Sequence, residues 1–197
     1  ALLWEGPAER IKNFFNNILL LPAGEQAESD LRRHAGRLSR FKPALVTGYP
    51  SALAGLCGFC RENGLDVPPP LAVVTGGEML HPESRALISE VFGAPVYERY
   101  GRREFSVVAH ECPEHRGLHV FDDLFHVEVV REDGGPAAPG ESGELVITDL
   151  SNFYMPLLRF RTGDIAVRGT TGCACGRNLS LLERIEKRTQ ERGGQNL

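Results

Sequence analysis

The amino-acid sequence predicts an α/β fold, in which a parallel sheet with flanking helices is followed by an antiparallel, barrel-like β subdomain. In the first part of the chain, short apolar strands alternate with helical segments, as they do when helices cover the faces of a parallel sheet. After about residue 116, short strands are separated only by turns, which is typical of antiparallel β structure. The 197 residues are 42% hydrophobic and 24% charged, which is the composition of a globular protein.

The first part is predicted to span residues 1–115 and to contain the parallel sheet. Residues 8–20 favour a helix because apolar side chains from Ile11 to Ile18 recur at helical spacing on one face. Gly64 is a helix stop signal, and Pro82 suits the first turn of a helix. The remaining helices are expected at residues 29–40, 51–63 and 82–92, and the strands at 44–46, 71–74 and 94–97.

The second part is predicted to span residues 116–185 and to be antiparallel. Residues 125–130 alternate apolar and polar side chains, as a half-buried strand does. Glycine-rich turns at 132–135 and 139–140 separate neighbouring strands. Residues 186–197 are rich in mixed charge and glycine, so we predict a hinge or linker there. The strands are expected at residues 119–121, 126–130, 144–148, 164–167 and 179–182.

Bulk properties exclude several classes of function. A net charge of −4 argues against nucleic-acid binding, and the sequence lacks the run of about eighteen apolar residues that a membrane span needs. The start of the sequence has neither a signal-peptide pattern nor an initiator methionine, so we expect a piece of a longer protein. Five cysteines, an odd number in a chain of this size, favour thiols or metal ligands in a reducing cytoplasm over disulfides.

Three polar or glycine-rich loops follow the predicted parallel strands, at 48–51, 76–78 and 100–104. Ligands of open parallel sheets bind beyond the carboxyl ends of the strands, so these loops are candidates for a binding site. Within 100–104 a tyrosine offers a stacking face, a glycine allows close approach, arginines can pair with phosphate and a glutamate can bind a metal ion. A plain surface turn would have a similar composition. A fourth candidate is Asp164, which follows a glycine turn and whose carboxylate could accept hydrogen bonds from two ribose hydroxyls, although an ordinary β-turn is the alternative.

Four motifs occur in the order and approximate spacing of the adenylate-forming enzymes. They are Gly48-Tyr-Pro-Ser51, Gly76-Gly-Glu78, Tyr100-Gly-Arg-Arg-Glu104 and Arg159-Phe-Arg-Thr-Gly-Asp164. The chain resembles the phenylacetate–coenzyme A ligase group and its capsule-biosynthesis-like, CapK-type relatives. Thr148-Asp-Leu-Ser-Asn152 and Cys173-Ala-Cys-Gly-Arg177 look like the same branch.

The resemblance implies that the parent protein uses ATP to convert a carboxylic acid, aryl or fatty, to an acyl-adenylate and releases pyrophosphate. The acyl group then passes to a thiol of coenzyme A or of a carrier protein. The implied cofactors are ATP, Mg²⁺ and coenzyme A. By the same resemblance, the site residues are Gly76, Gly77 and Glu78 at the adenine and acyl pocket, Tyr100 stacked on adenine, Gly101 beside the acyl carboxylate, Glu104 at Mg–ATP, Asp164 on the ribose and Arg188 before the hinge. Arg103 is expected either to contact phosphate through its charge or to face solvent.

The sequence departs from the family pattern at three places and lacks two of its parts. Arg103 stands where many relatives have threonine, Lys187 stands where glycine is usual, and Gln190-Glu191 replaces an acidic hinge pair. The phosphate loop and the C-terminal lysine domain of the family are absent, so we expect the fragment alone to be inactive. Two other readings stay open at this point: a non-catalytic nucleotide- or acyl-binding module, and a zinc-stapled interaction domain.

Cysteines and a histidine also suggest a metal site. Cys112, His119, Cys173 and Cys175 form a Cys₃His set, which is a pattern of structural zinc. The alternative is free thiols in a turn. Cys57 and Cys60 lie three residues apart in an apolar helix, so we predict that they are core residues.

Overall fold

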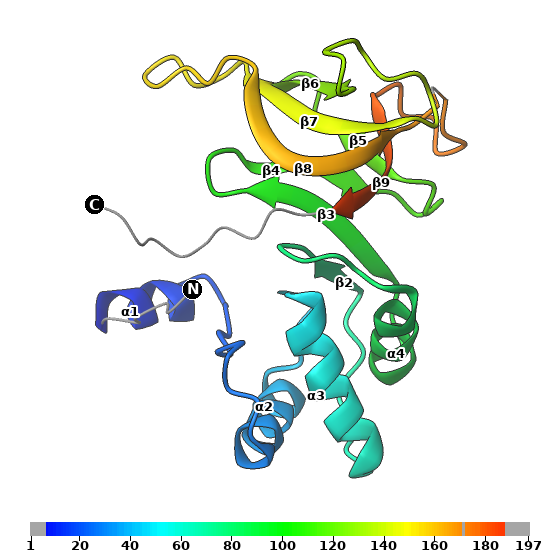
Figure 1. Cartoon of the computed structure of the whole chain (residues 1–197). Coiled ribbons are helices and arrows are strands. Elements are labelled where there is room, and N and C mark those ends of the chain that lie inside the picture. Colours follow the sequence, from blue (N-terminus) through cyan, green and yellow to red (C-terminus); the bar gives the residue numbers. More distant parts are fainter. Residues whose placement is uncertain (1–6, 171, 188–197) are drawn as a thin grey trace. The chain divides into compact units, whose positions relative to one another are not determined.

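The computed structural model describes residues 7–170 and 172–187 (Figure 1). The chain divides into two compact units. The first unit comprises Ala1–Thr75 and Leu80–Val96, and the second comprises Gly76–Met79 and Tyr97–Leu197. Within the described residues, no helix is both long and apolar enough to cross a membrane.

The first unit is an α/β structure. Strands β1 (Leu45–Gly48) and β2 (Ala72–Thr75) pair in parallel, and helix α3 (Pro50–Glu62) connects them in the chain. The other helices are α1 (Pro7–Phe15), α2 (Glu28–Phe41) and α4 (Pro82–Phe92) (Figure 1). Proline begins α3 and α4, where its fixed φ angle suits the first turn, and Gly93 ends α4 with a φ of +59°. The predicted parallel pairing is therefore confirmed.

Helix α1 ends five residues before the predicted position. Asn17 adopts a left-handed φ of +54°, which asparagine tolerates better than most residues and which turns the chain away from the helical path. The predicted apolar face of this helix is exposed, with Phe14 81% and Phe15 80% accessible. The apolar spacing therefore identified the helix but did not indicate a buried face.

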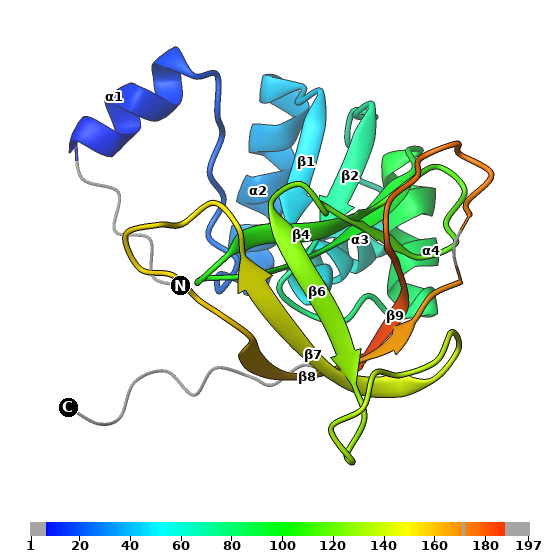
Figure 2. The same cartoon turned by 90° about the horizontal axis from the view of Figure 1, so that it is seen from above.

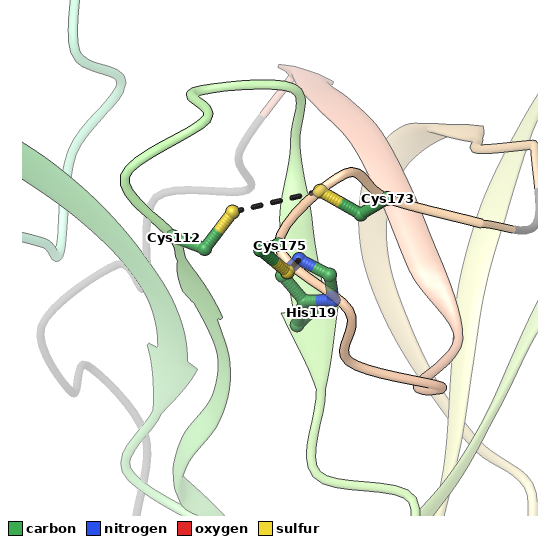
Figure 3. A group of neighbouring side chains, drawn as sticks. All are labelled: Cys112, His119, Cys173 and Cys175. Atoms are coloured by element: carbon green, nitrogen blue, oxygen red, sulfur yellow. Dashed lines mark hydrogen bonds between the residues drawn. The ribbon is translucent and has the colours of Figure 1, made fainter.

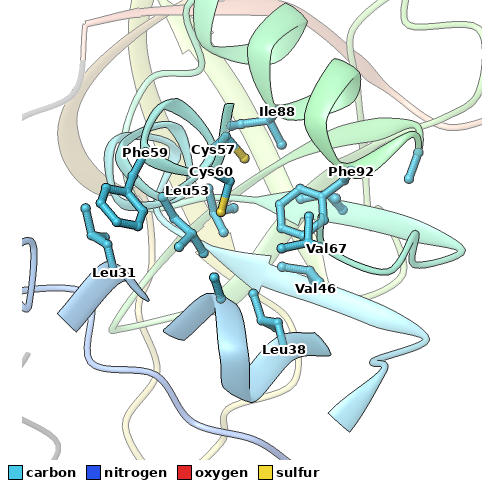
Figure 4. Packing of buried hydrophobic residues seen from close by; sticks show 14 of the residues in the cluster. Leu31, Leu38, Val46, Leu53, Cys57, Phe59, Cys60, Val67, Ile88 and Phe92 are labelled. Atoms are coloured by element: carbon cyan, nitrogen blue, oxygen red, sulfur yellow. The ribbon is translucent and has the colours of Figure 1, made fainter. Parts of the chain in front are cut away.

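The core of the first unit lies between helices α2, α3 and α4 and strands β1 and β2 (Figure 4). Cys57 and Cys60 are each 1% exposed and point into this core, which confirms their predicted role. Burial raises the pKa of the Cys57 thiol to about 12, with a smaller contribution from Cys60. The labelled neighbours in Figure 4 are Leu31, Leu38, Val46, Leu53, Phe59, Val67, Ile88 and Phe92.

The second unit is antiparallel. Antiparallel pairing is confirmed within residues 116–185, for which it was predicted, but it begins earlier, between residues 99–102 and 106–110, which were expected to belong to the parallel part. The strands of the second unit pair in the order β3-β4-β5-β9-β8-β7-β6, and every neighbouring pair is antiparallel. Figure 2 shows β4, β6, β7, β8 and β9 of this unit. The strands are β3 (Val96–Arg102), β4 (Ser106–Glu111), β5 (Leu118–Val120), β6 (Phe125–Val130), β7 (Ser142–Asp149), β8 (Phe160–Arg168) and β9 (Leu181–Lys187).

The prediction missed strand β4, and it ended β3 and β9 too early. Three consecutive apolar residues at 107–109 break the polar–apolar alternation that would have marked β4 as a strand. Strand β3 continues through Arg102, so residues 100–102 lie on a strand and not in a loop. Strand β9 includes the first two residues of the predicted hinge, and residues 188–197 lie outside the described part of the chain.

A β-bulge lies between Tyr100 and Gly101, where the register of β3 against β4 shifts. A Cβ atom added to Gly101 would lie 2.1 Å from the backbone oxygen of Ser106, far inside van der Waals contact. Glycine at position 101 therefore lets the two strands approach each other at the bulge.

The sheet of the second unit curves strongly. Three strands separate β3 from β8 in the strand order, yet Tyr100 on β3 donates a hydrogen bond to Asp164 on β8. Figure 1 shows the bend of β7 and β8. The curved sheet encloses a core that includes Tyr100, Phe105, Leu145 and Ile147. The two motif residues thus meet inside this unit although they are far apart in the sequence.

Candidate nucleotide site and metal centre

The candidate nucleotide site is a group of four side chains from the second unit that are joined by two hydrogen bonds and an ion pair. The hydroxyl of Tyr100 donates to Oδ2 of Asp164 at 2.7 Å, and Nη1 of Arg102 donates to the same oxygen at 3.1 Å. Nε of Arg102 lies 3.5 Å from Oε2 of Glu104. Arg102 therefore contacts both Asp164, the proposed ribose ligand, and Glu104, the proposed ligand of Mg–ATP.

Strand β8 fixes the position of Asp164. The backbone N–H of Asp164 donates to Oγ1 of Thr162 at 3.0 Å, and this hydroxyl donates to the carbonyl oxygen of Leu145 on β7 at 2.8 Å. Thr162 and Asp164 alternate with exposed residues along β8, so both side chains face the interior. Gly163 between them has a φ of +74°, a conformation that glycine adopts at no steric cost.

Burial controls the electrostatics of the group. Tyr100 is 1% exposed and Asp164 is 0% exposed. Burial raises the pKa of the Tyr100 hydroxyl, and the hydrogen bond to Asp164 raises it further, so the phenol is protonated and donates. Burial is the largest single effect on the pKa of the Arg102 guanidinium and lowers it, but the charge and hydrogen bond of Asp164, with smaller contributions from Glu104 and Tyr100, together raise the pKa overall.

The glycine loop at 76–78 belongs to the second unit. A Cβ atom on Gly76 would lie 2.8 Å from Cγ and 3.1 Å from the backbone oxygen of Arg99, so glycine is needed for this close approach. Gly77 has a φ of +86°, in the region that favours glycine. Glu78 is partly exposed next to the two glycines.

The structure places the remaining predicted residues less centrally. Arg103 and Glu104 are exposed in the turn after β3, and Arg188 lies outside the described residues. The predicted roles of all these residues in nucleotide binding stay predictions. The family resemblance gave Arg102 no role, and the sequence indicated only that the arginines of 100–104 can pair with phosphate. Its ion pair with Asp164, which lies 62 residues further along the chain, has no signal in the local sequence.

All four predicted metal ligands come together in the second unit. Cys112 directly follows β4, His119 lies on β5, and Cys173 and Cys175 lie in the loop between β8 and β9 (Figure 3). The Sγ atoms of Cys112 and Cys173 are 3.7 Å apart, and Sγ of Cys175 is 3.4 Å from Nε2 of His119. One ligand atom from each residue lies within 4.8 Å of the other three.

These distances and donors fit a tetrahedral zinc ion. Zn–S bonds of ~2.3 Å place two sulfur ligands ~3.8 Å apart, close to the separation of Cys112 and Cys173. A backbone hydrogen bond from Arg177 is the main cause that lowers the pKa of Cys175 to about 7, which favours the thiolate form that binds metals. Burial lowers the pKa of His119, which favours the neutral imidazole that ligates. Nδ1 of His119 is buried without a hydrogen-bond partner among the described residues.

Comparison with known proteins supports the motif resemblance. Over 158 residues the chain is 34% identical to a phenylacetate–coenzyme A ligase of Thermus thermophilus, a match that covers 77% of this chain and 35% of the relative. Over 150 residues it is 23% identical to protein CapK of Staphylococcus aureus, covering 75% of this chain and 32% of the relative. No protein-family model matches the chain.

A solved structure supports the fold. The open conformation of a 2-hydroxyisobutyryl-CoA ligase, in complex with 2-HIB-AMP and CoA, is 26% identical to the chain, with a TM-score of 0.74. The match covers 85% of this chain and 41% of the solved chain. This chain therefore spans between about a third and two fifths of the length of these relatives. On the agreement of fold, motifs and relatives, the chain belongs to the adenylate-forming superfamily and is phenylacetate–coenzyme A ligase-like.

Proposed function

We propose that the chain is part of an enzyme that activates a carboxylic acid, aryl or fatty, with ATP to an acyl-adenylate and passes the acyl group to a thiol such as that of coenzyme A. The observation that carries this proposal is the 2.7 Å hydrogen bond between Tyr100 and Asp164. The bond joins two motifs that lie 64 residues apart, and both match motifs of the adenylate-forming enzymes. The solved relative is described as a complex with 2-HIB-AMP and CoA, which is consistent with these reactants.

Each proposed role follows from the chemistry of adenylation, which needs the phosphates neutralised and the acyl carboxylate held in line. Glu104 is exposed and would bind Mg²⁺ of Mg–ATP, since carboxylate oxygens are preferred ligands of this ion. Asp164 would accept hydrogen bonds from the ribose hydroxyls, and adenine would lie beside Tyr100, whose ring is only 1% exposed before a nucleotide binds. The adenine and acyl groups would lie beside the loop of Gly76, Gly77 and Glu78, with Gly101 near the acyl carboxylate. Arg103 would contact phosphate.

The activity needs the whole protein, because the chain covers only 35% of the Thermus ligase. The test is exchange of labelled pyrophosphate into ATP by the full-length protein, with a panel of aryl and fatty acids. Wild type should show acid-dependent exchange, and Glu104→Gln should lower the rate by about 100-fold through loss of a ligand to Mg–ATP. Glu132→Gln, in an exposed turn of the second unit, should leave the rate unchanged.

Two outcomes of this assay would contradict the proposal. ATP binding without exchange for any acid would favour a non-catalytic nucleotide-binding module. Equal exchange by wild type and Glu104→Gln would remove Glu104 from the reaction.

A second part of the proposal is a structural zinc ion bound by Cys112, His119, Cys173 and Cys175. The four ligand atoms lie within 4.8 Å of one another and form a soft, closed set. The ion would tie the loop between β8 and β9 to strands β4 and β5, and would stabilise the second unit without taking part in the chemistry.

Metal analysis of the purified full-length protein tests this part directly. We expect about one zinc ion per chain for wild type, and none after the double substitution of Cys173 and Cys175 by serine, which should also lower the unfolding temperature. Cys57→Ala should keep its zinc, because Cys57 lies in the core of the first unit. Wild-type protein without stoichiometric zinc would overturn the assignment.

A further inference from the structure

Asp164 is closed off in this structure. Its carboxylate is 0% exposed and accepts hydrogen bonds from Tyr100 and Arg102. A ribose binds to a carboxylate by donating its 2′- and 3′-hydroxyl hydrogens, and both hydroxyls must come within about 3 Å of the oxygens. At least one side chain that covers Asp164 must therefore move before a nucleotide can bind as proposed above.

Tyr100 is the less movable of the two partners. It is 1% exposed, it belongs to the hydrophobic core of the second unit, and it precedes the bulge on β3. Moving its ring would open a large cavity in a packed core.

Arg102 is the more movable partner. It is the last residue of β3, its side chain is long, and it keeps 10% exposure. Its Nε atom is buried without a hydrogen-bond partner among the described residues, and it would gain water when the side chain turned outward. The ion pair that it makes with Asp164 is the main interaction that this movement would break.

We infer that Arg102 occupies the ribose-binding position of Asp164 in the nucleotide-free protein and is displaced when the nucleotide binds. This inference rests on the proposed function, since it needs Asp164 to be the ribose ligand. The two ribose hydroxyls replace the hydrogen bond from the guanidinium, and the released cation stays next to Glu104, where the phosphates and their Mg²⁺ are proposed to bind. Arg102 is thus a positioning residue that lowers the affinity for the ribose by competing for Asp164.

The test compares AMP with 2′,3′-dideoxy-AMP, which has the same base and phosphate but lacks both ribose hydroxyls. Dissociation constants are measured by calorimetry on the full-length protein, and the ratio of Kd for the dideoxy compound to Kd for AMP isolates the hydroxyl contribution. Arg102→Ser should raise this ratio about tenfold, the value of one charge-assisted hydrogen bond. If the serine variant does not fold, Arg102→Gln replaces it, because glutamine keeps more of the side-chain packing. This variant should raise the ratio about threefold.

Arg131→Ser is the matched control. Arg131 also lies in the second unit and pairs with a carboxylate, that of Asp133, but its side chain is exposed and it belongs to none of the site motifs. The ratio for this variant should equal that of wild type.

The outcomes separate the two proposals. An unchanged or lower ratio in folded Arg102 variants that still bind AMP would overturn the role of Arg102 and leave the proposed function intact. Wild-type protein that binds neither nucleotide and shows no pyrophosphate exchange would overturn both.

Discussion

Tyr100→Phe removes a single hydroxyl from the centre of the candidate site. The substitution keeps the ring in the hydrophobic core but deletes the 2.7 Å hydrogen bond to Asp164, which is 0% exposed. A hydrogen bond to a buried charged group contributes about 1.5–3 kcal/mol, so the free energy of unfolding should fall by ~2 kcal/mol. With a urea dependence of ~2 kcal/mol per molar, the midpoint of unfolding should fall by ~1 M.

Urea unfolding followed by circular dichroism measures this change, and Tyr154→Phe is the matched control. Tyr154 is 104% exposed, so loss of its hydroxyl should leave the midpoint unchanged. The reasoning would be refuted by a Tyr100→Phe protein with the same midpoint as wild type, since the hydroxyl would then contribute nothing to the position of Asp164. A fall of the same size in both variants would also refute it.

Two other predictions concern the stability of the protein. Gly101→Ala should destabilise the protein by at least ~2 kcal/mol, because its Cβ would lie 2.1 Å from the backbone oxygen of Ser106. The control is Gly36→Ala, on an exposed face of α2 with open space around the new Cβ, and this substitution should be neutral or stabilising. Equal changes in the urea midpoint of unfolding for the two substitutions would contradict the bulge geometry. Stability should also fall as the pH rises above about 9, because the folded-state pKa values of Cys57 and Tyr100 are raised and the unfolded chain releases these protons first. The loss should be smaller in Tyr100→Phe at pH 10 and above, and a free energy of unfolding that is constant from pH 8 to 11 would contradict this account.

Much of the fold could be predicted from local sequence patterns. Pro82 and Gly93 bound helix α4 as expected, because both residues act through their own backbone preferences. Strand β4 was missed because three apolar residues in succession do not distinguish a buried strand from a helix. The end of β3 was misplaced because the bulge at Gly101 depends on Ser106 of the partner strand, which no local pattern contains.

The candidate site depends on contacts between distant segments. The Cys₃His set could be proposed from residue types, since zinc needs few and specific ligands, and the structure brings all four residues together. The contact between Tyr100 and Asp164 follows from the curvature of the second sheet, which the sequence does not encode locally. The family resemblance gave both residues roles on one nucleotide but did not predict the hydrogen bond between them. The ion pair of Arg102 with Asp164 could be predicted neither from residue types nor from the family resemblance, because the motifs assign position 102 no partner.

A crystal structure of the full-length protein with bound AMP tests the central claim most directly. The account predicts that the ribose hydroxyls lie within hydrogen-bond distance of the Asp164 carboxylate, with the adenine beside Tyr100 and the Arg102 guanidinium moved away from Asp164. AMP bound elsewhere, with Asp164 still closed off by Tyr100 and Arg102, would contradict it.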